Sequence, residues 1–519
     1  MSTRWGWSVD DKIIVSNRAA LKAKYGGAGL TRIKNAVDAL IAADAKRGIK
    51  SRLVYLDEAA AMKSFKGSAV TDHTNARQNK RAIDAIFRTA TPEYLMILGA
   101  PDVVPHQDMT NPMYDPPDDP DKYAEGDLPY ACDEEYSRDI ATFRGPTRVV
   151  GRLPDLTKAN EPSHLLALIE IAAKYRSRGV TDYGKYFGLS THSWRKSTAL
   201  SLFNIFVNSD ALTLAPPNGP AHPARRLAPL AHFINCHGGM SDPAFYGEKG
   251  NSQPEALTSK TIAKKIKAGT VAAVECCYGA ELYDSITLAL PMPICQRYLV
   301  QGAYGYFGSS TIAYGPEEGN GAADLITQYF LVAVLNGASL GRAALSARQG
   351  FVQQTAELDP ADLKTLGQFN LLGDPSIHPA TITKATRVPK GVDVDQSSRQ
   401  ARRERRAKLR AVGEFLQETK PTASRKVGKV RKSATVRKAL ANIARAAGIG
   451  ARKDFTAFDV KSPKGTRPRG SKATPVASRY YVAVYRPKKR SLDVESRSVA
   501  AVAREVNGRI VGYRIYTEK

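Results

Sequence analysis

Two stretches of the sequence decide the fold: LAHFINCHGGMSD at residues 230–242 and GTVAAVECCYGAELYD at residues 269–284. Each is a short apolar run that ends in a reactive side chain followed closely by Gly, namely His237 in the first stretch and Cys276 and Cys277 in the second. Short apolar runs closed by Gly are typical of buried strands. Because the carboxyl ends of neighbouring parallel strands lie at one edge of a sheet, the sequence predicts that these side chains meet there.

The same alternation of apolar strands and amphipathic helices extends over most of the chain. Strands are predicted at 12–15, 51–56, 94–98, 147–150, 185–190, 231–235, 270–274 and 303–307. Helices are predicted at 30–45, 75–89, 163–175, 196–206, 322–335 and 338–351. This pattern predicts an α/β fold, a mostly parallel sheet with helices on both faces. Residues 109–128, which are rich in Pro and Asp, are predicted to form an exposed loop.

Four parts are predicted along the chain. Residues 1–180 and 181–381 form two α/β halves, the second of which carries the His and Cys residues. Residues 382–474 are a basic linker that is mobile or partly helical, with helices at 400–416 and 434–447. Residues 475–519 form a small segment in which two strands flank a helix at ESRSVAAVAREV, with Asn507-Gly508 as a turn.

The charge of the chain is concentrated in its last part. Of the formal net charge of +26, residues 381–519 carry +25, from 36 Lys and Arg against 11 Asp and Glu. Such a basic segment can bind nucleic acid through phosphates, and Tyr480, Tyr481, Tyr485, Tyr513 and Tyr516 could stack on bases. An acidic protein, an anionic membrane surface and a solvated tail are the other interpretations, and a small aromatic core is the more frequent use of such tyrosines.

Composition narrows the class of protein. With 519 residues, 43% of them hydrophobic, the chain is globular rather than collagenous or fully disordered. Five cysteines are too few for a disulfide scaffold, which favours a reducing compartment. No apolar run is long enough to form a transmembrane segment, and the first residues lack the order of a signal peptide, so a cytoplasmic location is expected.

The His and Cys residues suit nucleophilic catalysis. An unperturbed thiol is mostly protonated at neutral pH, and an adjacent imidazole can take its proton and later protonate a leaving amine. The N–H groups of Gly238 and around Cys277 could form an oxyanion hole. Two other interpretations compete: each cysteine alone is more often an inert core residue, and a zinc site is disfavoured because adjacent ligands on a strand point to opposite faces.

The sequence resembles the gingipain family of cysteine peptidases in the caspase-like superfamily. INCHGG and VECCYGA resemble the His-Gly and Cys elements of that family, and the resemblance extends to KIIVSN, RLVYLDE, EYLMILGAPDVVP, RVVGRLPD, GAYGYFGSSTIAYG and NLLGDPSIHP, over residues 11–380. It implies a caspase-like α/β sandwich in two sheet halves, and endopeptidase cleavage through a thioester without a cofactor or metal. A protein or peptide would then be the substrate.

The resemblance also implies roles for individual residues. His237 matches the family's catalytic His, followed by Gly238, and Cys277 matches the nucleophile better than the alternative Cys276. An acidic pocket for Arg or Lys would draw on Asp155, Asp242, Glu281 and Asp284. An acidic residue that orients the imidazole in some members is absent here, because Thr147 and Arg148 occupy its region. The alternative function is a non-catalytic protein that binds nucleic acid or protein on a caspase-like scaffold.

Overall fold

A ten-stranded sheet forms the centre of the molecule. The structure is a computed structural model that describes residues 10–116, 118–382, 399–428, 430–450, 454–461, 478–487 and 497–519. From one edge to the other the strands are β2 (Ser51–Tyr55), β1 (Lys12–Ser16), β3 (Tyr94–Leu98), β6 (Val150–Leu153), β17 (Phe369–Leu372), β15 (Gly305–Ser309), β14 (Val271–Val274), β10 (Ala231–Asn235), β8 (Tyr186–Ser190) and β9 (Leu212–Leu214).

The sheet consists of two parallel halves. Neighbouring strands from β2 to β17 are parallel, and so are those from β15 to β9. Strands β15 and β17 are antiparallel and join the halves into one continuous sheet. Strands β3 and β10 are buried along their whole length, as expected for strands covered on both faces. The predicted mostly parallel α/β fold is therefore confirmed.

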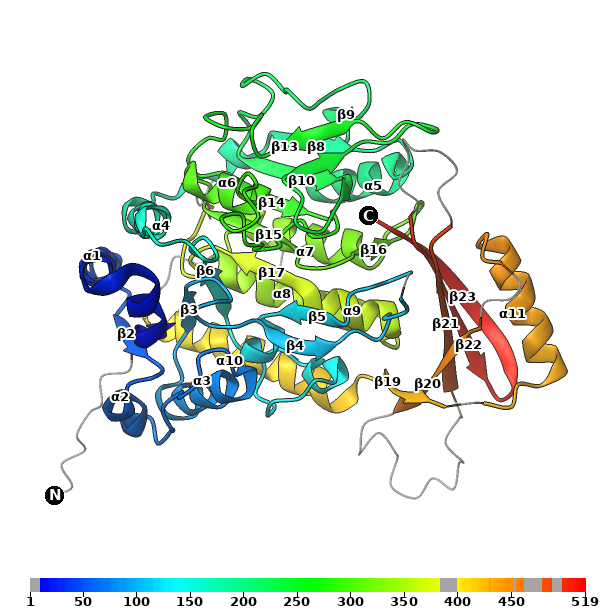
Figure 1. Cartoon of the computed structure of the whole chain (residues 1–519), viewed down its shortest axis with the longest axis horizontal. Coiled ribbons are helices and arrows are strands. Elements are labelled where there is room, and N and C mark those ends of the chain that lie inside the picture. The colour runs from blue at the N-terminus through cyan, green and yellow to red at the C-terminus, as the bar shows by residue number, and fades with distance from the viewer. Residues whose placement is uncertain are drawn as a thin grey trace.

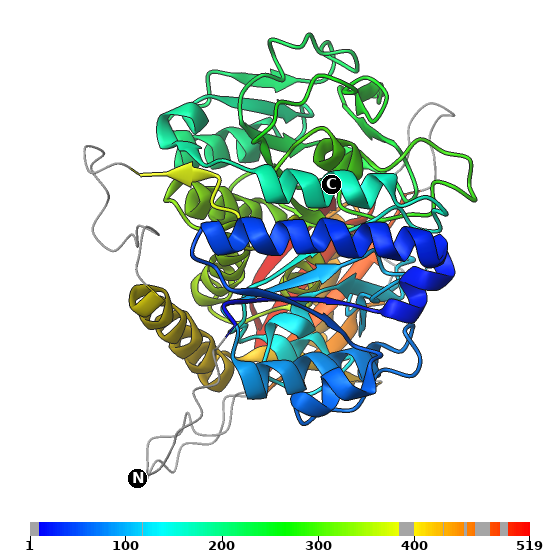
Figure 2. The same cartoon turned by 90° about the vertical axis from the view of Figure 1, so that its left-hand side faces the viewer.

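Helices cover both faces of this sheet. They are α1 (Arg18–Lys46), α2 (Ala59–Ser64), α3 (Ala76–Ala90), α4 (Ser163–Lys174), α5 (Arg195–Phe206), α6 (Ile294–Val300), α7 (Ala323–Leu335), α8 (Leu340–Gln354), α9 (Pro360–Gln368) and α10 (Arg399–Thr419). One further helix, α11 (Ala434–Ala446), does not pack on this sheet. Figure 1 shows α1, α4 and α6 on one side and α5, α7 and α8 on the other. In Figure 2, α1 lies across the sheet with α4 beside it. None of the helices in the described ranges combines the length and the apolar composition that a membrane crossing requires.

A second sheet, here called the small sheet, packs beside this body. Its strands are, in order, β16 (Tyr314–Gly315), β23 (Arg509–Glu518), β22 (Val499–Val506), β21 (Ser478–Tyr485), β20 (Thr456–Lys461) and β19 (Thr422–Val427). Alternate residues of its strands face opposite ways: Tyr481 and Ala501 pack with α11, whereas Tyr480, Val482 and Tyr516 join the main core. The small sheet therefore lies between α11 and the body (Figure 1).

The segment predicted to be helical within residues 495–506 is instead strand β22. Residues Val499–Val506 pair with β21 on one side and with β23 on the other, over nearly their whole length. The helix prediction was wrong because tertiary pairing outweighs the helical preference of the Ala residues. The turn at Asn507-Gly508 is confirmed, since both residues have positive φ values, 49° and 79°. Residues 488–496, part of the same prediction, lie outside the described residues.

The prediction of an exposed loop at residues 109–128 was also wrong. Strands β4 (Gln107–Thr110) and β5 (Tyr123–Gly126) form a hairpin at its ends. Between them, Asp119 is fully buried and Asp121 is 7% exposed. Burial is tolerated because Lys364 of α9 forms ion pairs with both carboxylates, at 2.7 Å and 3.4 Å.

Strand β6 begins three residues later than the predicted strand at 147–150. Its third residue, Arg152, is fully buried although it is charged. The guanidinium donates to Asp127 Oδ2 at 2.9 Å and to the Gly99 carbonyl at 2.9 Å, which satisfies the charge inside the sheet. An apolar pattern cannot reveal such a strand residue. Helix α1 likewise begins earlier than predicted, and Gly26 interrupts it with φ 69°.

The basic helix α10 packs against the body. Gly413 lies so close to Pro146 that a Cβ atom there would be 2.3 Å from the Pro146 carbonyl oxygen. Arg402 forms ion pairs with Glu93 and Asp11, at 3.1 Å and 3.6 Å. Part of the positive charge of the predicted linker is therefore used within the molecule, and its described portion is ordered around α10, β19, α11 and β20.

The remaining strands and helical turns are short. Strands β11 (His237–Gly238), β12 (Ala244–Tyr246) and β13 (Glu255–Thr258) form an antiparallel sheet beside the end of β10, and β7 (Arg178–Gly179) pairs with β18 (Ala380–Thr381). Three 3₁₀ turns cover Leu128–Ala131, Ile140–Phe143 and Val180–Tyr183.

Candidate functional site

His237 and Cys277 follow two neighbouring parallel strands. Strands β10 and β14 pair in parallel from Ala231–Val271 onward, so both residues lie at the same edge of the sheet. A Cβ atom at Gly238 would be only 1.9 Å from the Cys277 carbonyl oxygen. Residue 238 must therefore be Gly for the two turns to touch.

The two adjacent cysteines have different surroundings. The Cys276 sulfur accepts a hydrogen bond from the Cys236 N–H at 3.3 Å, and burial, followed by the charge of Cys236, raises its pKa well above the usual value. The Cys277 sulfur instead accepts from the Ala313 N–H at 3.2 Å, on the side of strand β16. Burial, with the Glu518 carboxylate as the next cause, raises the pKa of the Cys277 thiol. Only Cys277 therefore faces the small sheet, whereas Cys276 faces the core.

The imidazole of His237 is held by Glu248. Its Nε2 atom lies 3.1 Å from Glu248 Oε2, and the Trp194 ring packs edge-on against it with 4.5 Å between centroids. Ser193 Oγ donates to the same carboxylate at 2.8 Å, and Arg497 also contacts it. Burial alone would raise the pKa of Glu248, but the hydrogen bond with His237 and the charge of Arg497 lower it below its usual value.

Glu248 was missed by the sequence analysis. It lies beyond β12, and no motif or spacing marks it. The resemblance pointed to the region of Thr147 and Arg148, just before β6, for such an acidic residue, whereas the carboxylate that contacts the imidazole belongs to Glu248. The signal that finds Glu248 is spatial: β11 and β12 pair as His237 with Tyr246, which brings the residues that follow β12 beside the imidazole.

The last strand of the sequence lies along the site. Strand β23 pairs with β16 in antiparallel register, Glu518 opposite Tyr314 and Thr517 opposite Gly315. The Trp194 indole N–H donates to Thr517 Oγ1 at 3.1 Å. Trp194 thus contacts both the imidazole and the end of β23.

Lys519 continues this pairing up to the cysteine. Its N–H donates to the Ala313 carbonyl at 3.0 Å, and its backbone oxygen accepts the Cys277 N–H at 2.9 Å. An extended backbone is therefore held between Ala313 and Cys277, with an oxygen on the N–H group of the cysteine.

The side chain of Lys519 enters an acidic pocket. Its Nζ atom lies 2.8 Å from Asp324 Oδ1 and 3.1 Å from Glu275 Oε2, and all three side chains are fully buried. The amine also lies 5.2 Å from the centroid of the Trp194 ring. Burial opposes the charge of Lys519, but the two carboxylates raise its pKa above the usual value, while burial and then Asp324 raise that of Glu275.

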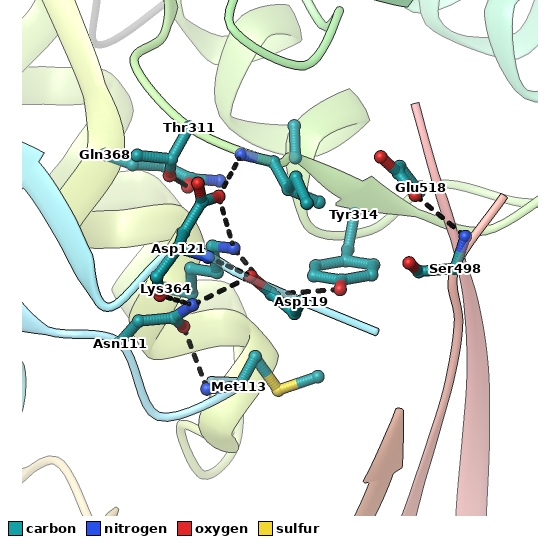
Figure 3. Close-up of polar contacts among 12 residues, drawn as sticks. Asn111, Met113, Asp119, Asp121, Thr311, Tyr314, Lys364, Gln368, Ser498 and Glu518 are labelled. Atoms are coloured by element: carbon teal, nitrogen blue, oxygen red, sulfur yellow. Dashed lines mark hydrogen bonds and ion pairs between the residues drawn. The ribbon is translucent and has the colours of Figure 1, made fainter. Parts of the chain in front are cut away.

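A buried polar network fixes the segment that pairs with β23. Asp121 accepts the Ile312 N–H at 2.7 Å, and Asp119 accepts the Tyr314 hydroxyl at 3.0 Å. Figure 3 shows Asp119, Asp121 and Tyr314 beside Lys364. Lys364 joins both carboxylates from α9. Burial raises the pKa of Asp119 despite this lysine. Residues 312–314 are therefore held rigidly beside Cys277.

The four carboxylates expected to form an acidic pocket have other partners. Asp155 forms an ion pair with Lys24 at 2.8 Å. The other three carboxylates accept backbone N–H groups: Asp242 from Ala244, Glu281 from Ser241 and Asp284 from Thr287. Glu275 and Asp324 form a separate acidic pair, which contacts the Lys519 amine. Glu275 lies next to the cysteine pair in sequence, but its role depends on Asp324, which the sequence analysis did not single out.

The tyrosines considered for base stacking are mostly buried. Tyr480, Tyr481 and Tyr516 are 7%, 1% and 3% exposed. Tyr485 is partly exposed, and Tyr513 is 54% exposed. The first three contribute to the two cores on either side of the small sheet. The alternation of aromatic residues therefore serves packing at these positions.

Comparisons with known proteins report structural similarity at low identity. No protein-family profile and no curated protein sequence matches the chain. A solved structure described as "Structure of Protease" is 14% identical, with a TM-score of 0.48 over 99% of this chain and 98% of that chain. The separase–securin complex of Saccharomyces cerevisiae is 15% identical, with a TM-score of 0.29 over 45% of this chain and 14% of that chain. The chain is thus similar in structure to a protease and, over part of its length, to separase.

Proposed function

We propose that the chain is a cysteine endopeptidase in which Cys277 is the nucleophile and His237 the general acid and base. One observation carries this proposal: the Cys277 N–H donates to the backbone oxygen of Lys519, in an extended strand that passes the turn of His237 and Gly238. This is the arrangement that a peptide carbonyl needs beside a nucleophilic sulfur.

The reaction follows from these positions. His237 takes the thiol proton as the Cys277 sulfur bonds to the carbonyl carbon, and the oxyanion accepts the Cys277 N–H. The carbon–nitrogen bond then breaks, and the leaving amine takes the proton from His237. Water attacks the resulting thioester, gives a proton to His237 and releases the acid, while the sulfur regains its proton.

Glu248 acts as a positioning residue in this proposal. Because its carboxylate engages Nε2 of His237, Nδ1 becomes the nitrogen that exchanges protons with the Cys277 sulfur. The carboxylate also stabilises the imidazolium that forms when the thiol loses its proton. Glu248 does not touch the substrate carbonyl, so its effect passes through His237.

The surroundings of the two cysteines support Cys277 over Cys276. The Cys276 sulfur accepts the Cys236 N–H at 3.3 Å and lies 4.0 Å from the Ile234 carbonyl oxygen, so it faces the end of core strand β10. The Cys277 sulfur lies against Ala313, the residue that also pairs with the extended strand at Lys519.

Covalent labelling tests the proposal. The full chain is incubated with a peptidyl acyloxymethyl ketone until modification is complete, and the modified cysteine is mapped by mass spectrometry. We expect the adduct on Cys277, its retention in Cys276→Ala and its loss in Cys277→Ala and His237→Ala. Modification of Cys276, or an adduct that survives Cys277→Ala, would overturn the assignment.

A further inference from the structure

We propose that residues Thr517–Lys519 occupy the place of a substrate's acyl-side residues, so that the chain holds its own site closed in cis with Lys519 in the pocket that receives a substrate lysine. This inference rests on the proposed function, and it concerns how the same site is filled. It uses only the contacts of these residues.

The backbone contacts are those of an added strand. Thr517 and Glu518 pair with Gly315 and Tyr314 of β16, and the Lys519 N–H donates to Ala313. Main-chain hydrogen bonds of this kind give affinity to any extended peptide, and a side-chain pocket adds the selectivity. A substrate strand would need the same hydrogen-bonding groups, so it competes directly with β23.

The pocket has the charge and size of a lysine site. Two buried carboxylates without a cation would be costly, and one lysine amine, 2.8 Å and 3.1 Å from them, offsets that cost. Gly315 forms one wall: a Cβ atom there would be 2.1 Å from Lys519 Cε. The close fit around an unbranched chain favours lysine over the broader, planar guanidinium of arginine.

The same contacts explain why Cys277 is fully buried. The cysteine lies beneath the Lys519 backbone, with its sulfur against Ala313. Glu518 is held outside the site by Arg486, at 2.8 Å, and by the Ser498 N–H, at 2.8 Å. The closing strand is thus anchored to the small sheet, and withdrawing three residues would open the cleft without unfolding the body.

Alkylation kinetics test the closure directly. Full-length wild type and Lys519→Ala are treated with iodoacetamide, and modification of Cys277 is followed by peptide mapping, with buried Cys276 as the internal reference. We expect Cys277 to react at least about tenfold faster in Lys519→Ala, because the strand loses its buried ion pairs. Lys519→Glu, which places a third carboxylate in the pocket, should react faster still.

Two controls separate this effect from general loosening. Arg509→Ala alters an exposed residue at the other end of β23 and should leave the Cys277 rate at the wild-type value. A peptide of the sequence Ile-Tyr-Thr-Glu-Lys, added to Lys519→Ala, should slow alkylation again, whereas the same peptide with Ala at the last position should not.

The outcomes distinguish the two proposals. Equal Cys277 rates in wild type, Lys519→Ala and Lys519→Glu would overturn the closure, even if the enzyme hydrolyses peptides. Faster alkylation in the variants, with no hydrolysis of lysyl peptides by any of them, would leave the closure standing and refute the peptidase. If the opened site reacts with an aspartyl peptide ketone as fast as with a lysyl one, the lysine pocket is refuted.

Discussion

Lys12 and Lys519 are each fully buried between two carboxylates, but they belong to different kinds of structure. Lys12 lies in strand β1 of the central sheet, 3.0 Å from Asp44 of α1 and in contact with Asp374 after β17. Lys519 follows β23 of the small sheet and meets Glu275 and Asp324 of the body. The first triad joins elements that are already part of one core, whereas the second joins two sheets through a short strand end.

This difference separates a structural ion pair from an exchangeable one. Removing Lys12 from its partners requires that the central sheet opens, because β2 and β3 pair with β1 on both sides. Removing Lys519 requires that Thr517–Lys519 leave β16, Ala313 and the start of β22, while the central sheet stays paired. A buried lysine with two acidic partners is therefore not in itself a sign of function. Whether such an ion pair can open depends on the element that carries the lysine.

The largest expected effect contrasts the two lysines directly. Lys12→Met removes the buried lysine shared by Asp44 and Asp374, leaving Asp44 with Arg47 at 3.4 Å, and should lower the free energy of unfolding by about 3–5 kcal/mol. Lys519→Met should lower it much less, since its strand can withdraw and let water reach Glu275 and Asp324. Urea unfolding followed by circular dichroism measures both. Equal losses in the two variants would contradict the distinction.

The next effect concerns Glu248, whose carboxylate contacts His237 of the body and Arg497 near the small sheet. In the Lys519→Ala background, Glu248→Gln should lower kcat for a lysyl peptide by up to about 100-fold and leave KM nearly unchanged, because the imidazole loses its orienting charge. Iodoacetamide labelling of Cys277 should also slow, because the imidazolium that accompanies the thiolate loses its counter-charge. A rise in KM with constant kcat would show that Glu248 binds substrate instead.

A smaller effect is expected when the wall of the lysine pocket is moved. Gly315→Ala places a methyl group 2.1 Å from Lys519 Cε and 2.6 Å from Asp324 Oδ2, so a lysine side chain no longer fits. In the Lys519→Ala background, where the site is already open, modification of Cys277 by a lysyl ketone should slow by roughly tenfold, the usual effect of one misplaced methyl group in a pocket. An alanyl ketone serves as the control and should react as before. Equal slowing with both ketones would indicate a general distortion.

A pH dependence of the docking of the small sheet is also expected. Burial, and then the neighbouring Asp359, raise the pKa of Asp362 from 3.8 to about 8, although Arg514 opposes this shift. Lys420 and the Tyr516 hydroxyl also face this carboxyl pair. A carboxyl whose pKa is raised on folding stabilises the folded state below its unfolded pKa, and this contribution is lost as pH rises.

The contribution of Asp362 to the stability should therefore be lost between about pH 4 and pH 8. Urea unfolding of wild type and Asp362→Asn at a series of pH values measures it, and the stability difference between the two proteins should change over this range. A difference that stays constant with pH would contradict the assignment to Asp362.

The sequence predicted the parts of the fold that depend on local pattern. The apolar runs of β3 and β10 have the bounds expected from them, and both lie fully buried in a parallel sheet. Their order also predicted that His237 and Cys277 follow neighbouring strands, which β10 and β14 are. Strand β6 was displaced because Arg152 is buried by partners from distant residues, which no local pattern contains.

The acidic pocket could not be predicted for the same reason. Glu275 and Lys519 are 244 residues apart in the sequence. Asp324 belongs to α7, whose sequence pattern is that of any helix packed on a sheet. The sequence analysis placed the acidic pocket among loop carboxylates near the sheet edge, such as Asp155, which instead pairs with Lys24. Nothing in the pattern of β23 indicates that its end reaches the cysteine of another sheet.

The crystal structure of Lys519→Ala after reaction with a lysyl acyloxymethyl ketone would show whether Lys519 and a substrate lysine share one site. We expect a covalent bond from the ketone to Cys277 Sγ, the inhibitor's lysine amine between Glu275 and Asp324, and residues 517–519 displaced from β16. A bond to another cysteine, or an inhibitor lysine bound elsewhere while residues 517–519 remain beside Cys277, would contradict it.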